Sequence, residues 1–358
     1  MKFTHIGISN YRNIEFTRLD IDASRVFFLG KNGQGKTNLL EAIGYCTALR
    51  AFRARENEII IGPKELYTEI VYEGIVGDGD VIQARARIKR KGKEVWLDGD
   101  PVKRASEFVG RLPTVVLSSE DLNIARGSPS LRRRYIDAFL CGIDREYYSS
   151  LQRYQKALQE RNALLKSNPK DNLLNVFETE LTKPAVSIIR KRREALLDLN
   201  ERAQSFYEQL SGGSEAIEIL YSPNCAIEEE ADYADVIKRS RKRDMILQST
   251  GKGPHRDDFQ FMINGRLAAD YASDGQLRSI ILALAFGIIE TWRKTIGENP
   301  VVLADDILGE LDPERRERFW KAMDPELQVF ATGTELPSNA DEWLIYEVEA
   351  GKFLKSGE

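Results

Sequence analysis

One motif constrains this chain more than any other feature, because residues 30–37 read Gly30-Lys31-Asn32-Gly33-Gln34-Gly35-Lys36-Thr37 and match G-x-x-x-x-G-K-[ST]. A largely apolar run over residues 24–29 precedes the motif, and a helical pattern opens at Asn38. In such a loop the glycines let backbone N–H groups turn inward, and the helix N-terminus adds a partial positive charge. The motif therefore predicts a phosphate-binding loop in an α/β fold, with Lys36 on the β- and γ-phosphates and Thr37 on Mg²⁺.

A second segment offers the acidic side chains that such a loop needs. The apolar run over residues 301–304 ends at Asp305 and Asp306. An acid at the end of a buried strand holds Mg²⁺ in enzymes with this loop, and we assign that role to Asp305. Side chains alternate along a strand, so Asp306 is expected on the other side, where it could orient or deprotonate the attacking water. The alternative is an acidic turn in solvent.

A second anion-binding signature lies at Ser273-Asp274-Gly275-Gln276, directly before a strongly apolar helical run over residues 277–288. Ser273 is a natural N-cap, and Gly275 lets a phosphate approach the backbone. One chain needs only one nucleotide, so we expect this signature to serve the nucleotide of a second copy. Asp312, in the segment 309–312, could cross the same interface. The alternative is an ordinary helix cap.

The pattern along the chain predicts a head interrupted by a helical lobe. Residues 1–130 and 245–358 are expected to form the head, and residues 131–244 a helical insert with short antiparallel helices, broken near Asn168-Pro169. Alternating apolar residues separated by glycine-containing turns predict an antiparallel meander after the phosphate loop. The predicted strands are 3–8, 14–21, 25–29, 67–75, 81–89, 94–97, 115–117, 217–221, 301–304 and 328–331.

Composition and net charge exclude several classes of protein and of binding site. The net charge of −4 means that any binding of nucleic acid must depend on local basic patches. The chain has three scattered cysteines with no C-x-x-C spacing, so neither a disulfide framework nor a zinc site is indicated. We see no membrane-spanning run and no signal peptide, and we expect a cytoplasmic protein with no membrane partner.

Basic residues gather in and beside the predicted insert, and they are candidates for contacts with DNA phosphates. The alternative is a solvated helix face balanced by nearby acids, and Arg133 could instead brace the head beside Pro129. Arg85, Arg87 and Lys89 share one face of a predicted strand. The candidate DNA-binding residues are Arg53, Arg132, Arg133, Arg190, Lys191, Arg192, Arg193, Lys238 and Arg241.

Together these motifs resemble the ABC-type ATPase heads of the SMC and RecF group: the phosphate loop, the S-x-G-Q signature, the acid pair and the following Glu310-Leu311-Asp312. The insert is far too short for the coiled-coil arms of an SMC protein. Further segments across the whole chain are similar to the RecF family, namely Asn10-Tyr11-Arg12-Asn13, Ala51-Phe52-Arg53, Glu120-Asp121-Leu122, Gly127-Ser128-Pro129, Arg132-Arg133 and Gly253-Pro254-His255-Arg256-Asp257-Asp258.

The resemblance implies a weak, DNA-stimulated ATPase of recombinational repair, replication and the SOS response. Such proteins use ATP and Mg²⁺, form homodimers around two nucleotides, and bind double-stranded and gapped DNA near single-strand boundaries. RecR would be the partner, with RecO and RecA in the same pathway. By the family pattern Arg12 and Asn13 join Gly30 to Asn38 in the ATP pocket, and the segment from Ser118 to Asp121 is the expected equivalent of the Q-loop.

Two departures from transporter-type ATPases predict slow hydrolysis. Asp274 stands where transporters have glycine, and an acid that points inward would repel phosphate. The strand over 328–331 runs into Thr332-Gly333-Thr334, where transporters carry a switch histidine. Two other functions remain open: an SMC-like engine that acts on a protein partner, and a nuclease, for which the sequence offers no further carboxylate-rich cluster.

Overall fold

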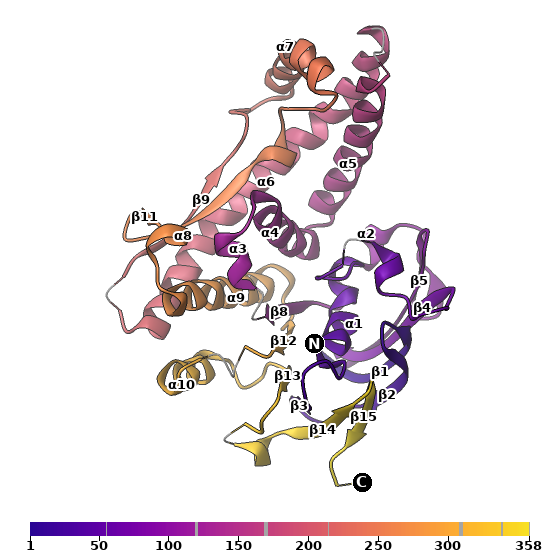
Figure 1. Cartoon of the computed structure of the whole chain (residues 1–358), viewed down its shortest axis with the longest axis vertical. Coiled ribbons are helices and arrows are strands. Elements are labelled where there is room, and N and C mark those ends of the chain that lie inside the picture. The colour runs from indigo at the N-terminus through magenta and orange to yellow at the C-terminus, as the bar shows by residue number, and fades with distance from the viewer. Residues whose placement is uncertain are drawn as a thin grey trace.

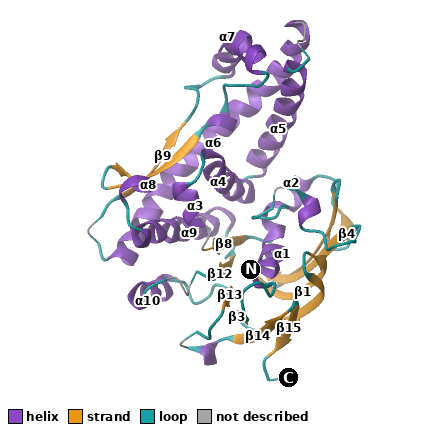
Figure 2. Cartoon of the chain, in the orientation of Figure 1, coloured by secondary structure: helices purple, strands orange, loops and turns teal. Residues whose placement is uncertain are grey.

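The computed structural model describes residues 1–54, 56–118, 121–167, 171–213, 215–307, 311–337 and 339–357, with the backbone alone at 171 and 172. Helices dominate one end of the molecule, where α5, α6 and α7 lie, and the larger sheets lie at the other end (Figures 1 and 2). Both ends of the chain lie in the sheet-rich half (Figure 1). Within the described residues, no helix combines the length and the apolar character needed to cross a membrane.

A six-stranded sheet carries the phosphate loop, in the order β15-β14-β3-β13-β12-β8. Strands β14, β3, β13, β12 and β8 are parallel, and β15 closes the edge antiparallel to β14. Because the carboxyl ends of parallel strands share one edge of the sheet, the residues that follow β3, β12 and β13 meet there. The bounds are β3 Arg25–Leu29, β8 Thr114–Ser118, β12 Val301–Asp305, β13 Val329–Gly333, β14 Leu344–Glu349 and β15 Lys352–Lys355.

The second six-stranded sheet is the predicted meander, in the order β2-β1-β4-β5-β6-β7. Its strands are all antiparallel, and alternate side chains of β4 and β5 are buried. This alternation is typical of a sheet with one face on the core and the other towards solvent. The bounds are β1 Lys2–Tyr11, β2 Ile14–Asp20, β4 Tyr67–Val76, β5 Asp80–Lys89, β6 Lys93–Leu97 and β7 Asp100–Pro101.

Helices α1, α9 and α10 accompany the first sheet, and α4 to α7 build the helical end (Figure 1). Side chains cap several of these helices: the Asp144 carboxylate accepts hydrogen bonds from the backbone N–H groups of Glu146 and Tyr147 at the start of α5. The bounds are α1 Lys36–Ala48, α2 Ala105–Phe108, α3 Leu122–Arg126, α4 Pro129–Ile143, α5 Arg145–Leu165, α6 Asp171–Ser211, α7 Glu230–Leu247, α8 Ala268–Tyr271, α9 Asp274–Ile296 and α10 Pro313–Ala322, with short 3₁₀ turns at Asn57–Ile59, Pro254–Arg256 and Ala340–Glu342.

The prediction of short helices in the insert was wrong for α6, which has 41 residues and continues through Pro184. A proline removes one hydrogen bond of a helix, and the packing of α6 against α5, α7 and α9 offsets that loss. The predicted break at Asn168-Pro169 lies outside the described residues. The expected strands are confirmed as elements, with ends shifted by at most a few residues.

A small third sheet bears on the division into lobes. Strand β10, Asp258–Ile263, pairs with β9, Ile217–Ser222, on one side and with β11, Arg266–Leu267, on the other. A boundary after residue 244 would separate β9 from β10. The division into a head and an insert stays a prediction, and we propose that β10, β11 and α8 be grouped with the helical end.

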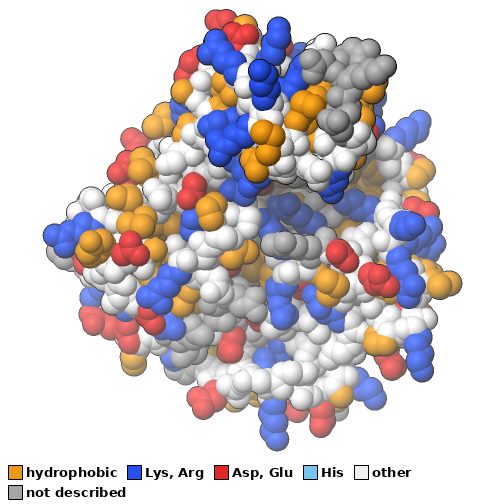
Figure 3. All heavy atoms as spheres, turned by 45° about the horizontal axis from the view of Figure 1, so that its top comes forward, with side chains coloured by type: hydrophobic (Ala, Val, Ile, Leu, Met, Phe, Trp, Pro, Cys, Tyr) orange, Lys and Arg blue, Asp and Glu red, His pale blue; other side chains and the backbone are white. Residues whose placement is uncertain are grey.

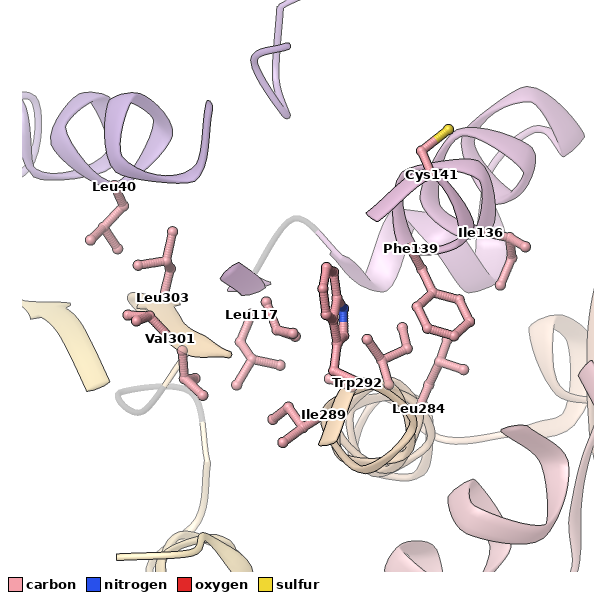
Figure 4. Close-up of a cluster of buried hydrophobic side chains, with 14 of the residues drawn as sticks. Leu40, Leu117, Ile136, Phe139, Cys141, Leu284, Ile289, Trp292, Val301 and Leu303 are labelled. Atoms are coloured by element: carbon pink, nitrogen blue, oxygen red, sulfur yellow. The ribbon is translucent and has the colours of Figure 1, made fainter. Parts of the chain in front are cut away.

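One continuous apolar core connects the two ends of the molecule, and α9 runs through it. Figure 4 shows Trp292 and Leu284 of α9 facing Phe139 of α4, with Leu117 of β8 close by. A methyl group at Gly142 would lie only 2.4 Å from the Trp292 ring, so glycine there allows α4 to approach α9 closely. Helix α9, which begins with the signature residues, is therefore packed rigidly against both the sheet and the helices.

Candidate functional site

The phosphate loop adopts the curled conformation that its sequence predicts. Gly33 and Gly35 have positive φ angles of 79° and 111°, which residues with a side chain rarely adopt. The Lys36 ammonium donates hydrogen bonds to the carbonyl oxygens of Gly30 at 2.5 Å and Lys31 at 3.0 Å. Lysine thus lies folded back along the inside of its own loop, where an ammonium group can exchange carbonyl oxygens for phosphate oxygens.

Lys36, Thr37, Asp305 and Asp306 come together at the carboxyl edge of the parallel sheet. The Thr37 hydroxyl donates a hydrogen bond to the Asp305 carboxylate at 3.0 Å. Burial lowers the pKa of Lys36, against the opposing charges of Asp306 and Asp305. Burial also raises the pKa of Asp305, although hydrogen bonds from Thr332 and Thr37 favour its charged form. A hydroxyl and a carboxylate, both hard oxygen ligands, thus converge beside a cation.

Thr332 is a site residue that sequence reasoning missed. Strand β13 lies between β3 and β12, and near its end the buried Thr332 hydroxyl donates to Asp305 at 2.9 Å. The same oxygen accepts a hydrogen bond from the backbone N–H of Asp306 at 2.9 Å. Asp306 itself has a positive φ of 53°. Thr332 thus contacts both acids, but a threonine inside an apolar strand gives no motif that sequence analysis could use.

Two segments distant in sequence support the loop from outside. The Asn13 amide donates to the Gln34 carbonyl oxygen at 3.2 Å and accepts from Asn38 at 2.8 Å. From the turn between β14 and β15, the N–H groups of Ala350 and Gly351 donate to the side chain and the carbonyl of Gln34, both at 2.8 Å. The structure therefore brings Asn13, Gln34 and Asn38 together, and their hydrogen bonds support the phosphate loop.

A buried carboxylate in α1 organises two arginines near the loop. Glu41 is fully buried, and it accepts hydrogen bonds from the Arg12 guanidinium at 2.7 Å and from the backbone N–H of Arg53 at 3.0 Å. Burial opposes the charge of Arg12, yet the bond to Glu41 holds the pKa of Arg12 above its ordinary value. The positive charge of exposed Arg53 acts on Asp305. Arg53 therefore lies near the acid pair rather than among the other DNA-binding candidates.

The signature residues form the N-terminus of α9. The Ser273 hydroxyl accepts from the N–H of Gln276 at 3.3 Å, and the Gln276 side chain accepts from the N–H of Ser273 at 2.7 Å. This reciprocal capping box leaves Ser273 exposed at the surface. The Asp274 carboxylate pairs with Arg126 of α3 at 2.6 Å.

Helix α10 reaches the same place. Asp312 caps α10 by accepting from the N–H of Arg315 at 2.9 Å, and its carboxylate lies 3.4 Å from the Arg315 guanidinium. A methyl group at Gly275 would come within 2.0 Å of the end of the Arg315 side chain, so glycine leaves room for this arginine beside the signature. Asp312 thus lies next to Arg315, which contacts the signature; that it crosses an interface stays a prediction, and Gly309 and Glu310 lie outside the described residues.

The start of α9 and the phosphate loop of the same chain do not meet. In Figure 1 the start of α9, next to α8, lies on the opposite side of the molecule from α1. At the two ends of the segment expected as the Q-loop equivalent, Ser118 pairs in register with Asp305, and its N–H donates to Asp121 at 2.7 Å. Ser119 and Glu120 lie outside the described residues.

The structure corrects part of the predicted DNA surface. Arg192 is only 1% exposed and pairs with Asp137 at 2.7 Å and Asp257 at 2.8 Å. Arg132, also buried, forms a two-pronged ion pair with Asp258. These arginines neutralise acids inside the helical end, so they are not available to DNA phosphates.

Three further candidates are held by partners. Arg241 pairs with Glu178 with little exposure, and Arg133 donates to the carbonyl of Asp257, so both act as braces. Lys191 pairs with Asp144 and with Glu146. Assigning Arg241 to the DNA surface was wrong for the same reason as for Arg192, namely a buried carboxylate that the sequence places far away.

Other basic residues do reach solvent. Arg190 is exposed on α6, and Arg193 is 42% exposed beside Glu228. Figure 3 shows Lys and Arg side chains over the helical end and within the hollow beneath it. On α7 the exposed cations are Lys238, Arg239, Lys242 and Arg243.

Comparison with known proteins places this geometry in a family. The model of the RecF/RecN/SMC N terminal domain matches residues 2–335. The DNA replication and repair protein RecF of Leptospira interrogans is 34% identical over 349 residues, which cover 95% of this chain and 94% of that protein. The chain belongs to the RecF family. RecF of Geobacillus thermodenitrificans is 32% identical, with 98% of each chain covered.

Solved structures agree with this assignment. The recombination mediator protein RecF, solved with ATP and described as part of the RecFOR pathway, superposes with a TM-score of 0.89 at 30% identity, covering 99% of this chain and 97% of that one. An SMC head bound to the C-winged helix domain of ScpA superposes with a TM-score of 0.53 at 15% identity, covering 100% and 98%, which shows a shared fold alone. The predicted fold class, an ABC-type head with a helical lobe, is confirmed for this RecF-family chain.

Proposed function

We propose that this RecF-family protein binds ATP with Mg²⁺ and that ATP joins two copies into a dimer that binds DNA. The observation that carries the proposal is the separation of two phosphate-binding elements in one chain. The loop with Lys36 and Thr37 faces the acid pair, whereas the capped serine of α9 lies exposed on the opposite side. Two copies arranged head to tail would bring each Ser273 to the other copy's nucleotide.

For each nucleotide, Lys36 and the N–H groups of the loop would bind the phosphates. Arg12 and Asn13 would border the pocket, since one is held by Glu41 and the other frames the loop. The related RecF solved with ATP supports this assignment. From the second copy, Ser273, Gly275 and Gln276 would contact the γ-phosphate, with Asp312 beside them.

The residues present fit a magnesium ion. The Thr37 hydroxyl and the Asp305 carboxylate lie 3.0 Å apart, and both are the hard oxygen ligands that Mg²⁺ prefers. These two residues would hold the ion, which supplies positive charge against the β- and γ-phosphate oxygens.

Hydrolysis would be slow. Asp306 would accept a proton from a water molecule as the water oxygen bonds to the γ-phosphorus and the bond between that phosphorus and the β–γ bridging oxygen breaks. ADP and phosphate leave, and the dimer opens. The segment Thr332-Gly333-Thr334 at the end of β13 carries no histidine, which supports a weak ATPase.

DNA would bind through exposed cations of the helical end rather than through the buried arginines. Lys238, Arg239, Lys242 and Arg243 on α7, with Arg190 and Arg193 on α6, offer a surface for phosphates. The RecF name and the RecFOR pathway of the relatives support binding at gapped duplexes, with RecR and RecO as partners and RecA as the protein to be loaded. As part of this proposal the protein works in the cytoplasm.

Sedimentation of the purified chain tests the proposal, with and without ATP and Mg²⁺, and then with a gapped duplex at two salt concentrations. We expect a dimer with ATP, a monomer with ADP, and loss of the dimer in Lys36→Ala and in Ser273→Arg. The two variants are complementary, since only Ser273→Arg keeps ATP binding. A monomer at micromolar concentration with saturating ATP would refute the dimer.

The measurements with DNA distinguish this function from that of an SMC-like ATPase that acts on a protein partner. Each of Lys238→Gln and Lys242→Gln is expected to lower the slope of log affinity against log salt by about 1 if the residue contacts a phosphate. Binding that ignores both ATP and salt would favour the SMC-like ATPase.

A further inference from the structure

Two arginines from different elements contact the N-terminus of α9. Arg126 of α3 pairs with Asp274 at 2.6 Å, and the two side chains are 46% and 62% exposed. Arg315 of α10 lies against Gly275. The signature thus has two guanidinium groups beside it, in addition to its own free N–H groups.

One anion, the Asp274 carboxylate, already lies beside one of these arginines. Asp274 is the first residue of α9, where a carboxylate is favoured by the helix dipole, and Arg126 neutralises it. A terminal phosphate carries about two negative charges and three acceptor oxygens, against one charge and two oxygens for a carboxylate. Guanidinium groups bind both anions with the same two-pronged geometry. A phosphate that reached this point would therefore compete with Asp274 for Arg126.

We propose that Arg126 binds the γ-phosphate of the second copy's nucleotide and that the Asp274 carboxylate pairs with Arg126 until that nucleotide arrives. The inference rests on the ATP-joined dimer proposed above and adds a phosphate-binding residue from outside the signature. In the free monomer Asp274 holds Arg126 in position. In the dimer Arg126 turns to the phosphate and no longer screens Asp274, whose charge then opposes the closed state.

The location of Arg126 gives this exchange a further consequence. Helix α3 follows directly after Asp121, which bonds to Ser118 beside the chain's own acid pair. Asn123, Ile124 and the neighbouring Gly127 line a cavity of about 360 Å³, so α3 is not tightly packed on that side. A change of partner at Arg126 would reach the segment next to the chain's own nucleotide.

A set of four proteins tests the exchange by the ATP-dependent dimer constant in sedimentation: the unaltered chain, Arg126→Gln, Asp274→Asn and the double variant. We expect Arg126→Gln to weaken the dimer about tenfold and Asp274→Asn to tighten it several-fold. In the Asp274→Asn background, Arg126→Gln must still weaken the dimer, because its partner there is phosphate. If it has no effect in that background, Arg126 serves only to neutralise Asp274 and the proposal is overturned.

The matched control is Arg90→Gln, which removes an exposed arginine paired with Glu58 at 3.5 Å on the meander. It should leave the dimer unchanged. ATP binding to the monomer, measured by calorimetry, should be unaltered in Arg126→Gln because the arginine acts on the other copy's nucleotide.

Mixed dimers show which of the two copies supplies the Arg126 that acts on a given nucleotide. A Lys36→Ala copy offers its signature but no nucleotide, and a Ser273→Arg copy offers a nucleotide but no signature, so their mixture forms one complete site. Adding Arg126→Gln to the Lys36→Ala copy should weaken this mixed dimer, and adding it to the other copy should not. The reverse result overturns the proposal. If the unaltered chain forms no dimer with ATP, the dimer proposal itself has failed; if it dimerises and the Arg126 variants match it, only this inference has failed.

Discussion

The Thr332 hydroxyl lies 2.9 Å from the Asp305 carboxylate, and the same oxygen accepts the backbone N–H of Asp306 at 2.9 Å. One buried side chain of β13 therefore contacts both Asp305, the last residue of β12, and Asp306, which follows it. The hydroxyl favours the charged form of Asp305, against the burial that raises its pKa.

Thr332→Val should impair hydrolysis more than folding. Valine has nearly the same shape, but it removes the donor to Asp305 and the acceptor for Asp306, so the pKa of Asp305 should rise further. We expect the ATPase rate to fall about tenfold, equivalent to about 1.4 kcal/mol, at saturating ATP. Steady-state phosphate release measures it. Thr332→Ser keeps the hydroxyl and should retain most of the rate; equal losses in both variants would point to packing instead.

Glu41→Gln should weaken ATP binding. Glu41 accepts from Arg12 and from the N–H of Arg53, and a glutamine amide can offer only one oxygen to these two donors. The bond that holds Arg12 beside the proposed pocket is then weakened, and we expect roughly tenfold lower affinity for ATP by calorimetry. Glu65→Gln, which alters an exposed acid bonded to Asn10, should bind ATP normally. Unchanged affinity for ATP in Glu41→Gln would show that Arg12 and Arg53 do not contribute to the ATP pocket.

Arg192→Met should destabilise the protein. Removing the guanidinium leaves Asp137 and Asp257 buried without their cation, a change that costs about 3–5 kcal/mol. The neighbour Arg193 forms an exposed ion pair, and Arg193→Gln should change stability by less than about 1 kcal/mol. Urea unfolding compares the two. A stable Arg192→Met protein that had lost DNA binding would contradict the structural role.

His255 should make the fold sensitive to mild acid. Burial lowers its pKa to about 4, and its ring bonds to Tyr154 at 2.6 Å and to the Thr250 carbonyl at 2.9 Å, with Arg256 and Arg133 adding positive charge nearby. Between about pH 6.5 and 4 the unfolded chain takes up a proton that the folded chain excludes, so falling pH lowers stability. The loss reaches about 3 kcal/mol below pH 4 as an upper estimate.

The check on His255 is the difference between two unfolding curves. Urea unfolding of the unaltered chain and of His255→Gln at several values between pH 4 and 7 isolates this group from the carboxylates, which titrate in both proteins. The unaltered chain should lose stability more steeply towards pH 4. Parallel curves would show that the pKa of His255 is the same in the folded and unfolded chains.

Local patterns were sufficient to predict the parts of the site that act through neighbouring residues. The loop at Gly30 to Thr37, the acids Asp305 and Asp306, and the N-cap at Ser273 each lie within a short stretch of sequence, so local sequence determines their geometry. The buried arginines could not be predicted in this way. Arg192 meets Asp257 across 65 positions, and no pattern in either segment distinguishes this arginine from exposed Arg193. Thr332, Glu41 and Arg126 were missed because each acts only through a distant partner.

The support of the phosphate loop from the β14–β15 turn has a consequence for synthesis of the protein. Gln34 receives the N–H of Ala350, which lies 316 positions later, and its carbonyl receives that of Gly351. Strand β3 and the loop leave the ribosome long before this hairpin exists. When the phosphate loop has been synthesised, the nascent chain therefore still lacks two of the hydrogen bonds that support this loop. Tight binding of a nucleotide should be acquired late, after the β14–β15 turn has emerged from the ribosome.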